Sequence, residues 1–352
     1  MKILGIETSC DETAAGIVKD GKELLSNTVF SSMDIHAAYG GVVPEIAARS
    51  HIEVINKVID TSLKDAGCRW SDIDGLAVTF GPGLSGSLLI GVIAARTLAI
   101  INSKPLYGAN HMLGHVYANF LNSSKISGYL MPKNQPKLPM LAIIISGGHS
   151  QLVLFHDHFK YKLLGQTEDD AIGEAFDKVA KMLGLGYPGG PAISSIAKKG
   201  DKLAFKLPIA KVPEYNFSFS GLKTAVLRQA QELVEENYTF PSIKLPERLN
   251  DAEKANLAAS FEYIAIKSIV NKAKQAVNEF QPASVVIAGG VAANSELRKQ
   301  LKEEITIPIQ MPDIKLCTDN GAMIATLGCY MNKYGQPLAD PYKLTIDPNL
   351  TI

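Results

Sequence analysis

Short apolar runs alternate along the chain with segments of helical periodicity. The apolar runs end in polar or glycine-containing turns, which predicts buried strands at residues 2–6, 14–19, 73–79, 140–145, 151–155 and 285–288. Apolar residues three and four positions apart predict helices at residues 52–66, 171–183, 251–280 and 319–332, together with a buried helix at 88–101. Strands and helices that alternate in this way indicate the α/β class.

One pattern occurs twice. An apolar strand, a small polar turn and a second apolar strand are found at residues 2–18 and again at 140–155. Because no shorter repeat is visible, we interpret this as a duplication of domain scale that gives two related lobes. The polar segment 122–139 contains three prolines and predicts a surface connection. The expected organisation is an N-terminal lobe at 1–121, completed by a C-terminal helix at 319–335, and a second lobe at 140–318.

Length and charge narrow the class of protein. At roughly 150 residues per domain, 352 residues suggest about two domains. Thirty-five Lys and Arg residues balance 35 Asp and Glu residues, so the formal net charge is zero. A general nucleic-acid packing protein usually carries a basic excess, and the balance argues against that class. The zero net charge is still compatible with a local basic patch on this chain, or with a partner that supplies one.

Cysteine usage and apolar run lengths predict the compartment. The four cysteines have no C-x-x-C spacing, which is typical of a reduced, cytosolic protein. The longest apolar run, residues 88–101, contains Arg96 and is shorter than the roughly 20 residues that span a bilayer. Glu7 comes too early for the apolar core of a signal peptide. We therefore expect a soluble, cytoplasmic protein with no membrane contact.

Three glycine-bearing turns follow predicted strands, at residues 81–86, 146–149 and 289–291. Glycine lets the backbone approach a ligand closely, and its N–H groups can cradle a phosphate. A single strand-to-helix turn often contains glycine for structural reasons alone, but three such turns in two related lobes favour nucleotide binding. No G-K-[ST] follows any of them, and none is a G-x-G-x-x-G at a first βα turn. A P-loop and a dinucleotide site are therefore disfavoured.

His111 and His115 are the sharpest local signal for metal chemistry. Positions i and i+4 share one face of a helix, so two imidazoles with this spacing can bind one transition metal. Two unrelated surface histidines fit the spacing equally well. Met112 stands where a zinc protease of the H-E-x-x-H type carries its general base, which weakens a protease interpretation. Asp319 is the best candidate for a third ligand, although its place before the last helix also suits an N-cap.

Two further segments are open to both functional and structural interpretations. Glu174 and Asp177 fall on one helical face and could hold a sugar hydroxyl, a metal or a proton, or simply form a solvated helix start. Residues 217–224 mix aromatic rings, hydroxyls and a lysine, and could stack on a base or touch a phosphate. A half-buried strand followed by a helix start explains that segment as well. Cys10 lies beside two acidic residues, which disfavours a thiolate.

Seven motifs occur in a fixed order along nearly the whole chain. They are GIETSCDET at 5–13, GPG at 81–83, HxxxH at 111–115, SGGH at 146–149, EAFDK at 174–178, FSFSGLK at 217–223 and CTDN at 317–320. In this order they resemble the TsaD family, the tRNA N6-adenosine threonylcarbamoyltransferases, in its bacterial form. Seven ordered motifs are far more specific than any one of them.

The resemblance implies a fold and a site. The fold would be α/β and two-lobed, like that of actin, Hsp70 and the sugar kinases, with a central nucleotide cleft. His111, His115 and Asp319 would hold one divalent metal per subunit, iron or zinc. The residues implied for binding of the adenylate, and with it of ATP or AMP, are Ile144, Ile145, Ser146, Gly147, Gly148, Asp177, Gly190 and Asn294. No nucleophile is required, and none is visible.

The resemblance also implies a reaction and partners. The threonylcarbamoyl group would pass from threonylcarbamoyl-adenylate to N6 of the adenosine 3′ of the anticodon, in tRNAs that read ANN codons, to give t6A and AMP. Besides tRNA, the implied partners are a TsaB-like paralogue in a heterodimer, a TsaE-like ATPase and a TsaC-like synthase that supplies the adenylate. A partner that contributes part of the tRNA surface would agree with the neutral net charge. Residues 237–251 have no assignment.

Three other interpretations compete with the transferase. A small-molecule kinase or ATPase of the same fold is the main alternative, because the lobes and glycine turns would serve either activity. Kinases need a base beside the acceptor hydroxyl and normally Mg²⁺ rather than a histidine pair. A metalloprotease would need a glutamate directly after His111, and this chain has Met112 there. A partner-binding pseudoenzyme is disfavoured by the intact set of His111, His115 and Asp319.

Overall fold

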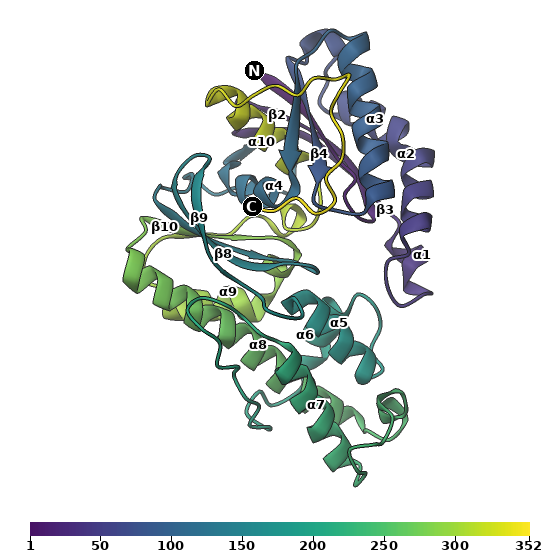
Figure 1. Cartoon of the computed structure of the whole chain (residues 1–352), viewed down its shortest axis with the longest axis vertical. Coiled ribbons are helices and arrows are strands. Elements are labelled where there is room, and N and C mark those ends of the chain that lie inside the picture. Colours follow the sequence, from purple (N-terminus) through teal and green to yellow (C-terminus); the bar gives the residue numbers. More distant parts are fainter. The chain divides into compact units, whose positions relative to one another are not determined.

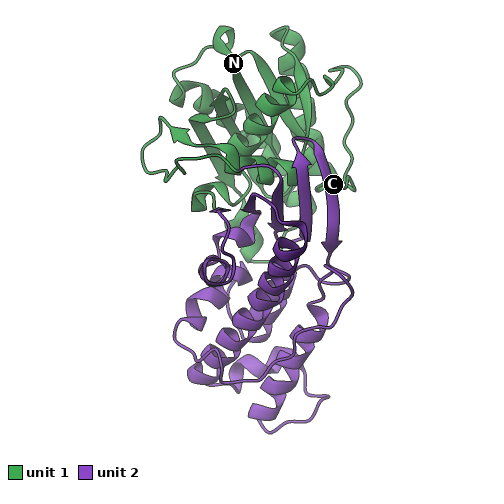
Figure 2. Cartoon of the chain, turned by 90° about the vertical axis from the view of Figure 1, so that its left-hand side faces the viewer, with its two compact units in different colours: residues 1–136, 310–352 green, residues 137–309 purple.

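The computed structural model describes all 352 residues, and contacts within the chain divide it into two compact units (Figure 2). Unit 1 comprises residues 1–136 and 310–352, and unit 2 comprises residues 137–309. Residues 122–136, expected in a connection, and residues 310–318, expected in the second lobe, are therefore part of unit 1. Asp313 links these two segments, because its carboxylate accepts a hydrogen bond of 2.7 Å from the backbone N–H of Leu130.

Unit 1 is built on a six-stranded sheet with the order β5-β4-β1-β2-β3-β6. The strands are β1 (Lys2–Glu7), β2 (Glu12–Lys19), β3 (Glu23–Ser31), β4 (Gly75–Gly81), β5 (Leu106–Asn110) and β6 (Ser123–Ser124). The first three form an antiparallel meander, whereas β4 runs parallel to β1 and β5 runs parallel to β4. The carboxyl ends of β1, β4 and β5 therefore lie at the same edge of the sheet.

Helices cover both faces of this sheet (Figure 1). They are α1 (Met33–Ala37), α2 (Pro44–Asp65), α3 (Ser85–Ile101), α4 (His111–Tyr117) and α10 (Gly321–Lys333), with short 3₁₀ turns η1 (Trp70–Asp72), η2 (Ala118–Phe120) and η5 (Ile314–Leu316). Leu4 and Ile6 pack into a buried core with side chains of α2 and α3. Gly5 faces the other way, as strand alternation requires, and a Cβ there would lie 2.2 Å from the backbone N of Ala325. Helix α10 therefore packs directly on the backbone of the sheet.

Unit 2 has a five-stranded sheet with the order β11-β10-β7-β8-β9. Its strands are β7 (Met140–Ile145), β8 (Ser150–Asp157), β9 (Lys160–Gln166), β10 (Ser284–Ala288) and, at the boundary of the unit, β11 (Ile309–Gln310). Its helices are α5 (Ile172–Met182), α6 (Gly189–Ala197), α7 (Ser220–Leu233), α8 (Asp251–Phe280) and α9 (Ser295–Glu304), with 3₁₀ turns η3 (Ser242–Glu247) and η4 (Gly290–Ala293). Helix α8 contacts α5, α6, α7 and α9 and forms the centre of the helical layer.

The two sheets repeat one topology. In each, three antiparallel strands follow one another, β1-β2-β3 and β7-β8-β9, and a later strand adds in parallel beside the first, β4 beside β1 and β10 beside β7. The mixed sheets confirm the predicted α/β class, and their shared strand order agrees with the predicted duplication. None of the helices combines the length and the apolar character needed to cross a membrane.

The predicted strands and helices are confirmed, with one notable difference in a boundary. Helix α2 begins at Pro44 rather than at residue 52. Proline suits the first turn of a helix, where its missing N–H would have no partner. The first turns of α2 bury Ala47, Ser50 and His51 rather than large apolar side chains. The apolar periodicity that marks the rest of the helix is therefore absent there.

Candidate functional site

His111 and His115 lie on α4, directly after β5. The helix begins at His111 because Asn110 caps it, with its side-chain oxygen accepting hydrogen bonds from the backbone N–H groups of Met112 and Leu113 at 2.8 and 3.1 Å. The i, i+4 spacing places both imidazoles on one helical face, with ring centroids 4.7 Å apart. Both histidines are buried, so the alternative of two unrelated surface histidines is wrong.

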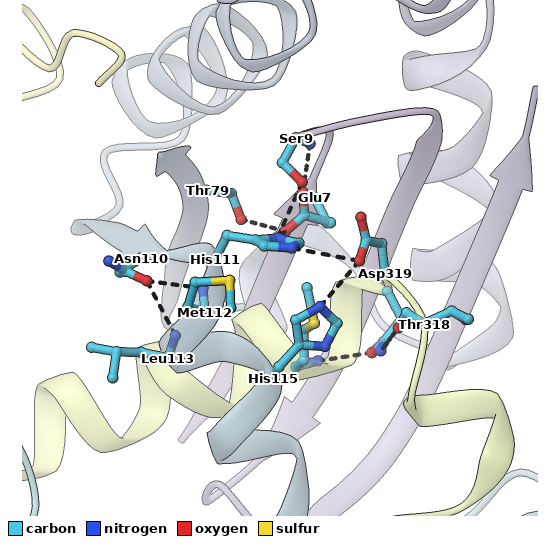
Figure 3. A network of polar contacts seen from close by, with 12 residues as sticks. Glu7, Ser9, Thr79, Asn110, His111, Met112, Leu113, His115, Thr318 and Asp319 are labelled. Atoms are coloured by element: carbon cyan, nitrogen blue, oxygen red, sulfur yellow. Dashed lines mark hydrogen bonds and ion pairs between the residues drawn. The ribbon is translucent and has the colours of Figure 1, made fainter. Parts of the chain in front are cut away.

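Asp319 points at both imidazoles (Figure 3). Its Oδ1 atom is 3.1 Å from Nε2 of His115 and 3.5 Å from Nε2 of His111. The alternative N-cap role for Asp319 is wrong, because Asn320 caps α10 by accepting a hydrogen bond of 2.9 Å from the backbone N–H of Met323. The neighbouring asparagine thus leaves the Asp319 carboxylate free to face the histidines.

These three side chains have the composition and spacing of a metal site. They offer two imidazole nitrogens and one carboxylate oxygen, and the three ligand atoms lie within 4.8 Å of one another. Ligand atoms held about 2.1 Å from one ion in a tetrahedral arrangement lie roughly 3.4 Å apart. The distances of 3.1 and 3.5 Å from Asp319 to the two imidazoles are of this size. Two histidines and one carboxylate are also a set that binds divalent transition metals with positions left open. The residues therefore fit a divalent metal.

The electrostatics of the three side chains point the same way. Burial lowers the pKa of His111, but the carboxylates of Asp319 and Glu7 outweigh it and raise that pKa above its ordinary value. Burial raises the pKa of Asp319, but the charge of His111 and the hydrogen bond from His115 outweigh it and lower that pKa below its ordinary value. Both shifts have one cause, the attraction between the buried carboxylates and a positive charge on the histidines. A bound divalent cation would take the place of that positive charge.

Glu7 orients His111 from the opposite side of the imidazole ring (Figure 3). Nδ1–H of His111 donates a hydrogen bond of 3.0 Å to Oε2 of Glu7, which directs the lone pair of Nε2 toward Asp319. Glu7 is itself fully buried, and its carboxylate accepts hydrogen bonds from the hydroxyl of Thr79 and the backbone N–H of Ser9. These residues come from the carboxyl ends of β1 and β4, beside the end of β5.

The sequence interpretation assigned no role to Glu7, although one signal was present. A carboxylate at the end of an otherwise apolar, buried strand needs partners, because an isolated buried charge is unfavourable. The identity of those partners depends on Thr79, Ser9 and His111, which meet only when the parallel strands β1, β4 and β5 are placed side by side.

We expect Glu7→Gln to lower metal affinity by about 10- to 100-fold, the range found when a group that orients a metal-binding histidine is lost. One carboxylate oxygen accepts from Thr79 and His111 and the other from Ser9, and a glutamine has only one acceptor oxygen for these donors. Competition with a chromogenic chelator measures the affinity. Glu23→Gln, at the partly exposed start of β3, is the matched control. An affinity within twofold of the wild-type value would rule out this orienting role.

The glycine turns of unit 2 lie at the carboxyl ends of two neighbouring parallel strands. Residues 146–148 follow β7 and Gly289 follows β10, and the two strands pair in parallel up to Ile144 and Ala288. Gly289 has φ +89°, and a Cβ there would lie 2.4 Å from the carbonyl oxygen of Ile145, so only glycine suits this turn. Gly147 and Gly148 have open space where a side chain would be. The ends of parallel strands in α/β sheets are where ligands commonly bind.

Asp177, Gly190 and Asn294 are brought into one neighbourhood by hydrogen bonds. Oδ1 of Asp177 on α5 accepts from the backbone N–H of Gly189 at 2.7 Å, at the start of α6. Gly190 is the next residue and has open space beside it. One turn further along α6, Ser194 accepts a hydrogen bond of 3.0 Å from the side-chain amide of Asn294. Burial raises the pKa of the Asp177 carboxyl, and the Gly189 hydrogen bond only partly offsets it.

The remaining sequence motifs are held in structural contacts. Lys223 and Lys178 both form ion pairs with Asp170, at 2.7 and 2.6 Å. Helix α7 begins at Ser220, which confirms the expected helix start. In place of the expected strand, Phe217 forms a single isolated bridge with Thr167. Burial, followed by the nearby acidic groups, raises the pKa of the Cys10 thiol, which agrees with the expectation that it is not a thiolate.

The segment without an assignment, residues 237–251, is tied to α7. It contains η3, and side chains of α7 donate hydrogen bonds to its backbone. Arg228 and Gln231 donate to the carbonyl oxygens of Tyr238 and Phe240, at 2.9 and 2.8 Å. Asn250 at its end caps α8 in a reciprocal pair with Glu253, in which the side chain of each residue accepts a hydrogen bond from the backbone N–H of the other.

Comparison with solved structures shows the fold. HypF from T. kodakarensis has a TM-score of 0.54 at 16% identity, over 95% of this chain and 48% of that chain. Component A of the (R)-2-hydroxyglutaryl-CoA dehydratase of Acidaminococcus fermentans has a TM-score of 0.51 at 15% identity, over 95% of this chain and 99% of that one. The predicted actin/Hsp70/sugar-kinase-like fold class is confirmed. The central nucleotide cleft stays a prediction.

Comparison of sequences shows the family. The family model described as "TsaD: tRNA N6-adenosine threonylcarbamoyltransferase" matches residues 23–326. A tRNA N6-adenosine threonylcarbamoyltransferase of Thermomicrobium roseum is 47% identical over 95% of this chain and 93% of its own length. The enzyme of the same name from Dictyoglomus turgidum is 45% identical over 100% of this chain and 99% of its own length. The resemblance is thus confirmed, and the chain is a transferase that belongs to the TsaD family, the tRNA N6-adenosine threonylcarbamoyltransferases.

Proposed function

We propose that this chain transfers the threonylcarbamoyl group from threonylcarbamoyl-adenylate to N6 of the adenosine 3′ of the anticodon, in tRNAs that read ANN codons. In this reaction the bond between the carbamoyl carbon and the phosphate oxygen breaks, and AMP leaves with its electron pair. A bond forms between the carbamoyl carbon and N6, which releases one proton. Membership of the family supports the proposal, and the intact cluster of His111, His115 and Asp319 is the observation in this chain that carries it.

We assign one divalent metal, iron or zinc, to His111, His115 and Asp319. When bound, such a metal supplies a Lewis acid that polarises an oxygen of the substrate. The protein side of this site is preorganised. Glu7 holds the tautomer and the direction of His111, and Thr79 and Ser9 hold Glu7. A site whose ligands are fixed in advance loses little free energy to reorganisation when it acts.

We assign binding of the adenylate to unit 2, at residues 144–148 with Asp177, Gly190 and Asn294. Open backbone at Gly147, Gly148 and Gly190 lets a ligand approach N–H groups closely, and such groups can hold a phosphate and stabilise developing negative charge. The carboxylate of Asp177 accepts a hydrogen bond from Gly189 and is proposed to accept another from a ligand hydroxyl.

The chemistry requires no covalent intermediate on the protein. AMP is a good leaving group, so an amine can attack the mixed anhydride directly once both are held in position. The raised pKa of Cys10 agrees with this, because a nucleophilic cysteine normally has a lowered pKa. We propose tRNA, a TsaB-like paralogue, a TsaE-like ATPase and a TsaC-like synthase as partners, and the cytoplasm as the compartment.

A single-turnover assay tests this function. Purified chain, with its partner proteins, is mixed with threonylcarbamoyl-adenylate and unmodified tRNA, and the nucleosides are analysed by mass spectrometry. The expected product is t6A at the position 3′ of the anticodon, with one AMP released per modified nucleoside. Absence of transfer, under conditions in which the same partners support another family member, would overturn the proposal in favour of a kinase or a pseudoenzyme.

A further inference from the structure

A buried carboxylate in the middle of α8 lies beside the proposed adenylate-binding residues, and no role has yet been given to it. Glu262 is only 7% exposed. Its Oε1 atom accepts hydrogen bonds from the hydroxyl of Ser194 at 2.5 Å and from the side-chain amide of Asn294 at 2.7 Å. It forms no ion pair with any lysine, arginine or histidine.

Only one of the two oxygens of this carboxylate accepts hydrogen bonds from the chain. Both of them end on Oε1. Oε2 accepts no hydrogen bond from the chain and is not one of the chain's fully buried unpaired atoms, so a ligand can reach it. A buried carboxylate without a cation is unfavourable unless its oxygens are well satisfied by donors. A carboxylate with a free oxygen is therefore suited to a ligand that brings hydrogen-bond donors.

The side chains of Asn294 and Ser194, which contact Glu262, already use their hydrogen-bonding groups within the chain. The amide of Asn294 uses its Nδ2 hydrogens on Ser194 and Glu262, and its Oδ1 caps α9 by accepting from Leu297 at 2.9 Å. The hydroxyl of Ser194 donates to Glu262 and accepts from Asn294. Ser194 and Asn294 thus fix the direction of the Glu262 carboxylate, and Glu262 is the member of this network with an oxygen left for a ligand.

We propose that Glu262 accepts a hydrogen bond from a ribose hydroxyl of the adenylate, alongside Asp177. Ser194 is a positioning residue, and Asn294 takes part in the adenylate site by holding Glu262. This inference rests on the proposed function, because it names how one part of that substrate is recognised. Ser194 lies one turn after Gly190 on α6, on the same helical face, so the carboxylate and the open glycine backbone belong to one neighbourhood.

The chemistry of the adenylate favours its ribose among the parts that could meet Glu262. Its phosphate and its threonine carboxylate are anions, which a buried carboxylate repels. The two adjacent ribose hydroxyls are neutral donors, and an acidic side chain is the usual partner of such hydroxyls in nucleotide sites. A metal is disfavoured, because Glu262 does not belong to a cluster of His, Cys, Asp or Glu side chains that could share one.

Binding of AMP and of 2′,3′-dideoxy-AMP to the full chain tests the proposal by isothermal titration calorimetry. Wild type is expected to bind AMP at least tenfold more tightly than the dideoxy analogue, as the loss of hydrogen bonds to a charged group predicts. In Glu262→Gln the ratio should fall at least threefold below the wild-type ratio, and the remaining discrimination is assigned to Asp177. Glu279→Gln is the matched control, because Glu279 lies on the same helix about 25 Å away and hydrogen bonds Tyr215. Its ratio should equal that of wild type.

Three results would overturn the inference. Equal binding of both nucleotides by wild type excludes hydroxyl recognition without any variant. A ratio that is unchanged in Glu262→Gln, with both affinities lowered alike, shows a structural role for Glu262. A change in the preference for AMP over inosine 5′-monophosphate, with no change in the dideoxy ratio, places Glu262 at the adenine amine. Ser194→Ala is the alternative variant if Glu262→Gln does not fold. It keeps the carboxylate but removes one of its hydrogen-bond donors, and it should lower the ratio of the affinities for AMP and 2′,3′-dideoxy-AMP by about threefold.

The same titration separates this inference from the proposed function. If wild type binds AMP tightly and Glu262→Gln has the wild-type ratio of affinities for AMP and 2′,3′-dideoxy-AMP, only the inference about Glu262 is wrong. Wild type that binds no AMP defeats the adenylate site of unit 2, and with it this inference.

Discussion

Replacing both His111 and His115 with alanine is expected to remove the bound metal and to lower single-turnover threonylcarbamoyl transfer by about 10³-fold. Two of the three ligands are lost, and the remaining carboxylate of Asp319 cannot hold a divalent transition metal alone. The loss of rate follows because a Lewis acid contributes several kcal/mol to the stabilisation of developing charge. Metal content per chain and the yield of t6A in one turnover are the two measurements.

The double variant needs a control that removes two histidines elsewhere. His156→Ala/His158→Ala serves, because both residues lie at the β8–β9 hairpin and outside the metal cluster. It should keep wild-type metal content and wild-type transfer. If transfer survives in a metal-free His111→Ala/His115→Ala variant, the activity stands but the metal has only a structural or incidental role. If the metal is retained, the assignment of the site to these histidines is wrong.

Asp177→Ala is expected to weaken binding of the adenylate by about 100-fold, while the free energy of unfolding falls by only about 1 kcal/mol. The large effect has two causes. The variant loses an acceptor for a ligand hydroxyl, and it loses the wild-type hydrogen bond from the N–H of Gly189 to this carboxylate, which alters the start of α6. The small effect on folding is that of losing a helix-capping side chain. Titration calorimetry with AMP and urea unfolding measure the two quantities.

Asp201→Ala is the matched control for Asp177→Ala. Its carboxylate likewise accepts a backbone hydrogen bond, from Leu203 at 2.9 Å, but it lies on an exposed turn. It should change stability by a similar amount and leave AMP binding unaltered. Normal AMP binding by Asp177→Ala would remove this residue from the adenylate site and leave it a purely structural cap.

Most of the secondary structure followed from local pattern alone. A strand that is buried on both faces, such as 140–145, is apolar at every position, and an amphipathic helix repeats its apolar residues every three or four positions. Both signals can be detected from neighbouring residues. The start of α2 was missed because small and polar side chains, Ala47, Ser50 and His51, are buried there, and their burial is set by the sheet rather than by their own character.

The pairing of His111 with His115 was also a local matter, because one helical turn brings them together whatever the rest of the chain does. The approach of the third ligand, Asp319, depends instead on the tertiary fold. Asp319 follows His115 by some two hundred residues, and it reaches the histidines because α10 packs on the glycine-lined backbone of β1 and β2. Its neighbour Asn320 takes the capping role that the sequence pattern allowed for Asp319.

The partners of the buried carboxylates depended entirely on the tertiary fold. Glu7 meets Thr79 and His111 because three parallel strands end at one edge of a sheet, and Glu262 meets Ser194 and Asn294 because α8 packs against α6 and the turn before α9. Residue types and short spacings were therefore enough to predict the fold class, the helical histidine pair and the family. The set of groups that surrounds each buried charge is a long-range property, because a charge inside a protein is stabilised by whatever donors the packing brings to it and not by its neighbours in the sequence.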